Sequence, residues 1–237
     1  MRKFLIVFVI LLFSAAAWAE NYNVYQPNEY KFEDAQERVL FILDFSNSME
    51  QEINGVRKVD LMLKTMGQIL PTIDKRTWVG LRVYGHRISL LQYDACRASK
   101  LLVPITPASE MLIRQKLAKT SPRGMTPITY SLKKAVDSDF LGFYGKKHII
   151  LLTDGGENCD ESPCLWAMKL VKKRKDVKID VIAFNISDKD DLDQLQCTAL
   201  VTAGKFHTAN TAAELAKSLQ KSLSPHKKVE AKIITNP

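Results

Sequence analysis

The chain lacks the sequence motifs of several large functional classes. Its 237 residues contain no G-x-x-x-x-G-K-[ST] phosphate loop and no G-x-S-x-G nucleophile elbow, so nucleotide hydrolysis and serine hydrolysis lack their usual parts. The four histidines and four cysteines do not show the spacing of a zinc site. Basic residues are not interleaved with aromatic ones, which argues against nucleic-acid binding.

No apolar run is long enough to span a bilayer. The longest covers residues 4–19, sixteen positions, whereas a transmembrane helix needs about 20. Two basic residues precede it, and Ala17 and Ala19 are small residues at the positions that signal peptidase recognises. We predict a signal peptide cleaved after Ala19 and a periplasmic or secreted protein, with an uncleaved membrane anchor as the alternative.

Composition allows one sizeable domain after this segment. Apolar residues make up 46% of the chain, enough for a substantial core. We expect a signal peptide over 1–19, a polar leader over 20–37, one domain over 38–223 and a basic tail over 224–237. The chain has 34 basic and 26 acidic residues, and we interpret the basic runs as solvated helix faces, with an anionic partner as the alternative.

Apolar runs of strand type alternate with segments of helical period through this domain. The connection after the second strand is too short and irregular for a crossover helix, so the second and third strands should be antiparallel. This pattern predicts an α/β fold with a doubly wound, mostly parallel sheet, one antiparallel edge strand and helices on both faces. Strands are expected over 38–44, 78–84, 101–105, 147–153, 178–184 and 205–209, and helices over 59–70, 109–119, 127–138, 163–174, 190–203 and 211–223.

Three small oxygen-bearing side chains follow the first strand. Asp44, Ser46 and Ser48 stand two residues apart where the apolar run ends. In a loop at a strand end this spacing lets the three side chains converge on one point. Hard oxygen ligands of this kind suit Mg²⁺, Mn²⁺ or Ca²⁺, although the same residues are also ordinary turn formers.

Two later stretches add matching groups. Thr126 precedes Pro127, which predicts a helix start with Thr126 at the N-cap. Asp154 follows the apolar strand 147–153 and precedes two glycines. Because ligands gather beyond the carboxyl ends of parallel strands, Asp44 and Asp154 should share one site.

Together these residues resemble the metal-ion-dependent adhesion site of the von Willebrand factor type A family. The family motif D-x-S-x-S, a distant Thr and a distant Asp is matched at Asp44, Ser46, Ser48, Thr126 and Asp154. The stretches YGHR, GMTP and TDG followed by C-x4-C are similar to those of exported bacterial members.

The resemblance implies a metal-dependent interaction module and no enzyme. Ser46, Ser48 and Thr126 would ligate a divalent cation directly, expected to be Mg²⁺, with Mn²⁺ or Ca²⁺ as alternatives. Asp44 and Asp154 would act largely through water. An Asp or Glu of a protein partner would then complete the coordination sphere. No nucleic acid is expected, and no stable membrane span after signal cleavage.

The even number of cysteines in an exported chain predicts disulfide bonds. Cys159 and Cys164 are only a few residues apart, and a bridge between them would brace one wall of the metal site. The pairing of Cys96 and Cys197 stays open, because these two could not meet if their strands lie on opposite sheet edges.

Two other functions stay open. His86, beside Arg87 at a strand end, is the candidate base of a metal-dependent hydrolase, although a packing role at the rim of the site is the simpler interpretation. The protein would alternatively be a structural envelope component whose metal only stabilises the fold.

Overall fold

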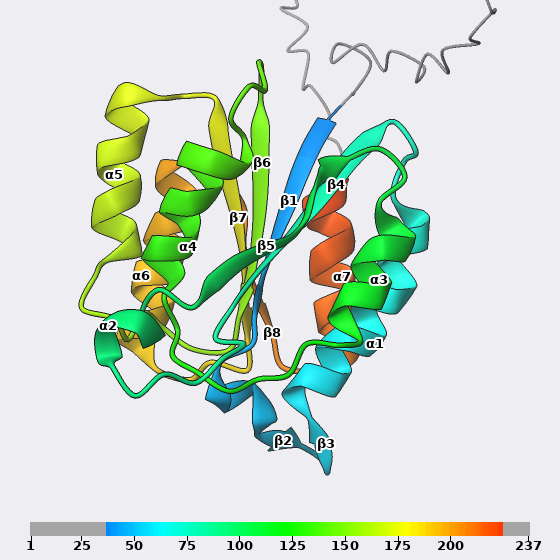
Figure 1. Ribbon diagram of the computed structural model, residues 1–237, viewed down its shortest axis with the longest axis vertical. Helices are drawn as coiled ribbons and strands as arrows, with labels where there is room; N and C mark the ends of the chain where they lie inside the picture. The colour runs from blue at the N-terminus through cyan, green and yellow to red at the C-terminus, as the bar shows by residue number, and fades with distance from the viewer. Residues whose placement is uncertain (1–36, 225–237) are drawn as a thin grey trace, which may run out of the picture. The chain divides into compact units, whose positions relative to one another are not determined.

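A six-stranded sheet forms the centre of the structure (Figure 1). The computed structural model describes residues 37–224, so the predicted signal peptide and nearly all of the leader and tail lie outside the described residues. The strands run in the order β5-β4-β1-β6-β7-β8. Their bounds are β1 (Glu37–Asp44), β4 (Thr77–Tyr84), β5 (Ser99–Thr106), β6 (Lys147–Thr153), β7 (Val177–Phe184) and β8 (Phe206–Ala209).

All neighbouring pairs in this sheet are parallel except β4 and β5. The connection between those two contains only the four-residue helix α2 (Gln92–Ala95), which is too short to carry the chain back across the sheet. β5 therefore turns back as an antiparallel edge strand. The predicted mostly parallel sheet with one antiparallel edge is confirmed.

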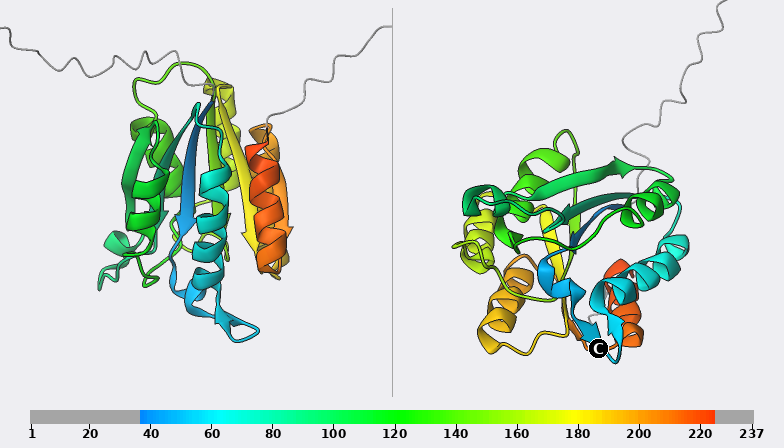
Figure 2. Two further views of the ribbon diagram at one scale, coloured as in Figure 1. Left: turned by 90° about the vertical axis from the view of Figure 1, so that its right-hand side faces the viewer. Right: turned by 60° about the horizontal axis from the view of Figure 1, so that its bottom comes forward.

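Helices cover both faces of the sheet (Figures 1 and 2). One layer holds α1, α3 and α7, and the other holds α4, α5 and α6. The bounds are α1 (Lys58–Ile69), α3 (Glu110–Leu117), α4 (Ile128–Lys134), α5 (Pro163–Lys173), α6 (Lys189–Val201) and α7 (Ala212–Leu223), with the 3-10 turns η1 (Asn47–Glu50) and η2 (Leu70–Thr72) and the π-helical turn η3 (Ala135–Asp139). A small hairpin, β2 (Glu52–Ile53) and β3 (Val56–Arg57), follows η1.

The central strand β1 is buried on both faces. Val39, Phe41 and Leu43 belong to the core beneath α1, α3 and α7. Leu40 and Ile42 belong to the core beneath α4, α5 and α6. All five side chains are fully buried, which explains why the strand is continuously apolar in sequence. The carboxyl end of β1 is therefore held in place by packing on both faces of the sheet.

Element ends differ from the sequence-based expectations by a few residues. The helix predicted over 190–203 ends at Val201, and Ala203 takes the left-handed conformation after it, with φ of 57°. Glycine is required at position 204, since a Cβ atom there would lie 1.8 Å from the carbonyl oxygen of Ile179. Across residues 37–224, none of the helices has the length and apolar character that a membrane crossing requires.

Candidate metal site

Four of the predicted ligands meet beyond the carboxyl ends of β1 and β6, at the lower edge of the sheet in Figure 1. Asp44 ends β1, and Ser46 and Ser48 lie in the turn that follows, where the chain enters η1. Asp154 follows the last residue of β6. The right-hand view of Figure 2 brings this edge forward. Because β1 and β6 pair in parallel, both carboxylates leave the sheet at the same edge.

These four residues form one continuous hydrogen-bonded chain. The Asp44 carboxylate accepts bonds from the Ser46 N–H at 2.6 Å and the Thr153 hydroxyl at 2.8 Å. The hydroxyls of Ser46 and Ser48 lie 3.0 Å apart, and Ser48 donates to Asp154 Oδ1 at 2.7 Å. Hydrogen bonds thus link five residues one after another, in the order Thr153, Asp44, Ser46, Ser48 and Asp154.

Thr126 reaches the same edge through the segment before it. Gly124 pairs with Ser46 in an isolated parallel bridge, and its carbonyl accepts the Asn47 N–H at 2.9 Å. A Cβ atom on Gly124 would lie 2.5 Å from the carbonyl oxygen of Arg87, so only glycine fits there. This contact brings Thr126, two residues further on and 4% exposed, to the edge that carries the other ligands.

The predicted N-cap role of Thr126 is wrong. Pro127 is the N-cap of α4, with φ of −80° and ψ of 68°, and Thr126 makes no capping hydrogen bond to this helix. The Thr126 N–H instead donates to Asn158 Oδ1 at 2.7 Å. Its hydroxyl is therefore not used at the helix start, and Thr126→Ala removes no helix cap.

The site carries more negative than positive charge. Burial, and then the nearby charge of Asp154, raises the pKa of Asp44 to about 6. Asp154 pairs with the buried Lys58 ammonium at 2.9 Å, and among residues 37–224 no ion pair includes Asp44. One buried cation thus faces two buried carboxylates. An oxygen-rich, electronegative site of this kind fits a hard divalent cation.

The oxygen set also decides which metals suit the site. Among residues 37–224 no group of three or more His, Cys, Asp or Glu side chains is arranged to hold a metal. The candidate site has only two carboxylates, and its other three predicted ligands are hydroxyls. It therefore matches the chemistry of Mg²⁺ better than that of a nitrogen- and sulfur-bound metal.

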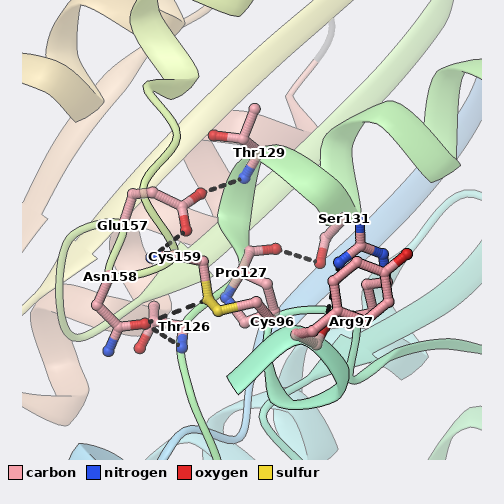
Figure 3. The surroundings of a disulfide bond; sticks show 10 residues. Cys96, Arg97, Thr126, Pro127, Thr129, Ser131, Glu157, Asn158 and Cys159 are labelled. Atoms are coloured by element: carbon pink, nitrogen blue, oxygen red, sulfur yellow. Dashed lines mark hydrogen bonds between the residues drawn. A yellow bond between two sulfur atoms is a disulfide. The ribbon is translucent and has the colours of Figure 1, made fainter. Parts of the chain in front are cut away.

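Both disulfides differ from the predicted bridge. Cys96 pairs with Cys159, and Cys164 pairs with Cys197, with Cα–Cα distances of 5.5 and 5.4 Å. Cys159 lies in the loop before α5 and faces the end of α2 (Figure 3). Cys164 lies in the first turn of α5, which packs on α6, where Cys197 lies. The short sequence distance between Cys159 and Cys164 did not predict their pairing. Cys159 lies before α5 and bonds to the end of α2, whereas Cys164 lies within α5 and bonds to α6.

The loop bonded to Cys96 holds the Thr126 segment (Figure 3). Glu157 accepts the Thr129 N–H at 2.6 Å, and Asn158 accepts the Thr126 N–H. The next residue is Cys159, so the disulfide anchors the loop that fixes this ligand. Sequence reasoning missed these contacts, as it missed Lys58 and Thr153. Only Thr153 had a signal, since it directly precedes Asp154.

His86 does not join the site's hydrogen-bonded chain. Burial, and then the charges of Arg87 and Lys100, lowers its pKa. Its Nδ1 is buried and has no hydrogen-bond partner within residues 37–224. Neither a hydroxyl nor a carboxylate of the described chain is bonded to this imidazole, so the geometry of a nucleophile activated by an oriented base is not seen.

A doubly wound sheet whose strand ends gather two carboxylates and several hydroxyls defines the class of α/β domains with a polar site at the carboxyl ends of the strands. The chain belongs to the von Willebrand factor type A domain family, whose model matches residues 39–222. It is 28% identical to the uncharacterized protein YwmD of Bacillus subtilis over 208 residues, covering 84% of this chain and 90% of that protein.

Solved structures share the fold. A von Willebrand factor type A structure from Catenulispora acidiphila matches with a TM-score of 0.61 at 14% identity, covering 80% of this chain and 42% of that one. Proximal thread matrix protein 1 from the mussel byssus, solved with a zinc-occupied metal-ion-dependent adhesion site motif, matches with a TM-score of 0.59 at 21% identity. That alignment covers 79% of this chain and 44% of the mussel chain.

Proposed function

We propose that this domain is a metal-dependent protein-binding module in which a divalent cation links it to an Asp or Glu of a partner. The observation that carries the proposal is the hydrogen-bonded chain of Asp44, Ser46, Ser48 and Asp154 with its excess of buried negative charge. Family membership supports it, because domains of this family commonly act as metal-dependent interaction modules.

In this proposal Ser46, Ser48 and Thr126 hold the ion directly, and Asp44 and Asp154 hold it largely through water. The cation supplies a Lewis-acidic position for a carboxylate. Hydroxyl ligands leave the ion less neutralised than direct carboxylate ligands would, which favours a strong bond to an acidic partner. We propose Mg²⁺, with Mn²⁺ or Ca²⁺ as alternatives. The zinc of the mussel protein makes Zn²⁺ a necessary comparison in the same titrations.

We also propose that the protein is exported, to the periplasm or beyond, after cleavage at Ala19. Among the described residues every cysteine is in a disulfide, which fits an oxidising compartment.

The experiment compares metal and partner binding by the mature protein and two variants. Asp44→Ala removes a buried carboxylate of the site, and the matched control Asp74→Ala removes an exposed carboxylate before β4. Calorimetry with Mg²⁺ and capture of partners from the exported fraction, with and without chelator, should show binding by wild type and control only. Partner capture that survives both chelator and Asp44→Ala in a folded domain would falsify the metal bridge.

The proposal includes no catalysed reaction. Purified protein with Mg²⁺ should not turn over phosphoester or peptide substrates. If the protein does turn over a substrate, and His86→Ala abolishes this turnover, the metal-dependent hydrolase is the correct function and the binding proposal is wrong. If Mg²⁺ raises the melting temperature but chelator does not change the capture of any partner, the metal only stabilises the fold.

A further inference from the structure

A second binding feature lies beside the candidate metal site. It is a cavity of about 510 Å³ between the loop after β4, strand β5 and the loop after α3. We call it the basic cavity. Four of its nine lining residues are Lys or Arg, and none is Asp or Glu. The lining consists of His86, Arg87, Ile88, Lys100, Leu102, Lys119, Thr120, Ser121 and Arg123.

The lysines and arginines of the basic cavity have no acidic partner among residues 37–224. Within residues 37–224, none of its lysines and arginines makes an ion pair or a side-chain hydrogen bond. Elsewhere in the domain, arginines near carboxylates are paired, as Arg82 is with Asp139 at 2.6 Å. Like charges gathered around one cavity repel each other, so a counter-charge from outside the domain would be attracted strongly.

The pKa of His86 is affected by the same positive charges. After burial, the charges of Arg87 and Lys100 are the causes that lower the pKa of its imidazole. Its buried Nδ1 has no partner among the described residues. The positive charges that line the cavity are therefore close enough to affect the His86 imidazole.

The basic cavity shares a wall with the candidate metal site. The Arg123 N–H donates to the carbonyls of Phe45 and Gly85 at 3.1 and 2.9 Å. The next residue, Gly124, is the one that pairs with Ser46. One short segment thus carries a cavity cation at one end and Thr126 at the other, so a single extended ligand can reach both places.

We infer that the basic cavity binds carboxylates of an acidic peptide segment of the partner, next to the Asp or Glu that reaches the cation. Several exposed cations on flexible side chains, spread around a cavity larger than one small anion needs, suit a chain of carboxylates. The inference rests on the proposed function for the metal contact. The charge argument for the cavity itself does not depend on it.

The test uses two fluorescein-labelled peptides of equal length, hexaglutamate and a peptide with one glutamate among glycines. The cavity variant is Arg87→Gln, Lys100→Gln and Lys119→Gln, all exposed positions. The matched control is Lys169→Gln, Lys172→Gln and Lys173→Gln, which removes the same charge from exposed positions on α5. Fluorescence anisotropy is measured with Mg²⁺ and with chelator, after urea unfolding has shown that both variants are folded.

With Mg²⁺, the cavity variant should bind hexaglutamate about tenfold more weakly, the combined effect of three exposed charge pairs. The control should stay within about twofold of wild type, and neither variant should change binding of the single-glutamate peptide. An equal loss in both triple variants would mean unspecific attraction by net charge and would overturn the inference. So would unchanged binding in the cavity variant, or inorganic phosphate that competes as well as hexaglutamate at equal charge.

The two proposals fail separately. If hexaglutamate binding depends on the cavity cations but is the same with Mg²⁺, with chelator and in Asp44→Ala, the cavity inference stands and the metal bridge fails. If chelator abolishes binding of both peptides while the cavity variant matches wild type, the metal bridge stands and the cavity inference is overturned.

Discussion

Two buried acidic clusters lie at opposite ends of the strands, and they are balanced differently. Toward the amino ends, His148 lies 3.0 Å from Glu37 and 3.2 Å from Asp180, and Lys178 lies 3.3 Å from Asp180. At the carboxyl ends, Lys58 pairs with Asp154, and Asp44 has no ion pair among residues 37–224. In the first cluster both carboxylates lie beside a His or Lys partner, whereas in the second only Asp154 does.

The pKa values show the same difference. Burial alone would raise the pKa of Asp180, but the hydrogen bond and charge of His148 outweigh it and hold the pKa at about 2. Burial and Asp154 raise the pKa of Asp44 to about 6. A buried carboxylate whose partners are already present stabilises the fold, whereas one that lacks a partner is suited to binding a cation from outside.

The same substitution should therefore affect the stability of the domain more in the first cluster than in the second. Asp180→Asn removes the buried carboxylate that pairs with His148 and Lys178 and should destabilise the domain by about 3–5 kcal/mol. Urea unfolding in chelator measures this loss. Mg²⁺ affinity should not change, because the cluster lies at the other end of the sheet.

The control for this prediction is Asp74→Asn, which breaks an exposed pair with Arg76. It should cost less than about 1 kcal/mol. Equal effects of the buried and the exposed substitution would show that the pairing of Asp180 with His148 and Lys178 does not stabilise the domain.

The two disulfides differ in their relation to the carboxyl-end cluster. Their sequence separations, 63 for Cys96–Cys159 and 33 for Cys164–Cys197, predict a similar loss of about 4 kcal/mol when either pair is replaced by serine. Only the first should also weaken Mg²⁺ binding, because it anchors the loop that holds Thr126. Urea unfolding and calorimetry separate the two effects.

Cys164→Ser with Cys197→Ser is thus the matched control for Cys96→Ser with Cys159→Ser. If both double variants lose Mg²⁺ affinity equally, general loosening is responsible, and the loop before α5 has no specific role in the site.

The disulfides also show where sequence reasoning stops. Strand ends can be located from apolar runs, so the shared edge of Asp44 and Asp154 was predictable from the parallel sheet. The pairing of Cys159 was not, because it depends on the direction in which the loop leaves β6 and meets α2. Lys58 was missed for the same reason, since nothing in the sequence signals that the start of α1 delivers an ammonium to Asp154.

Adding a divalent cation should give the carboxyl-end cluster the charge balance of the amino-end cluster. At 100 times its dissociation constant, Mg²⁺ should stabilise the wild-type domain by about 3 kcal/mol. Asp44→Asn should lose this gain yet cost little in chelator, because it removes one of two buried like charges. Urea unfolding with and without Mg²⁺ checks both parts. A variant that keeps the full gain would show that Asp44 does not support metal binding.

The smallest expected effect is the acid dependence of the amino-end cluster. The pKa of Asp180 is about 2 in the folded domain, against a reference value of 3.8. A carboxylate whose pKa is lower in the folded state stabilises the fold above its unfolded pKa, and this contribution disappears as the pH falls through the folded pKa. Between about pH 4 and pH 2 the domain should thus lose about 2 kcal/mol through Asp180.

Glu37, whose pKa is lowered mainly by its hydrogen bond to His148, should add to the loss in the same direction. Urea unfolding in chelator across this range measures the total. The contribution of Asp180 is the part of the pH dependence of the unfolding free energy that is missing in Asp180→Asn. In wild type, the carbon chemical shift of the Asp180 carboxylate should titrate near pH 2. A midpoint near 4 would mean that His148 and Lys178 do not hold this carboxylate, and the contrast between the two ends of the sheet would then disappear.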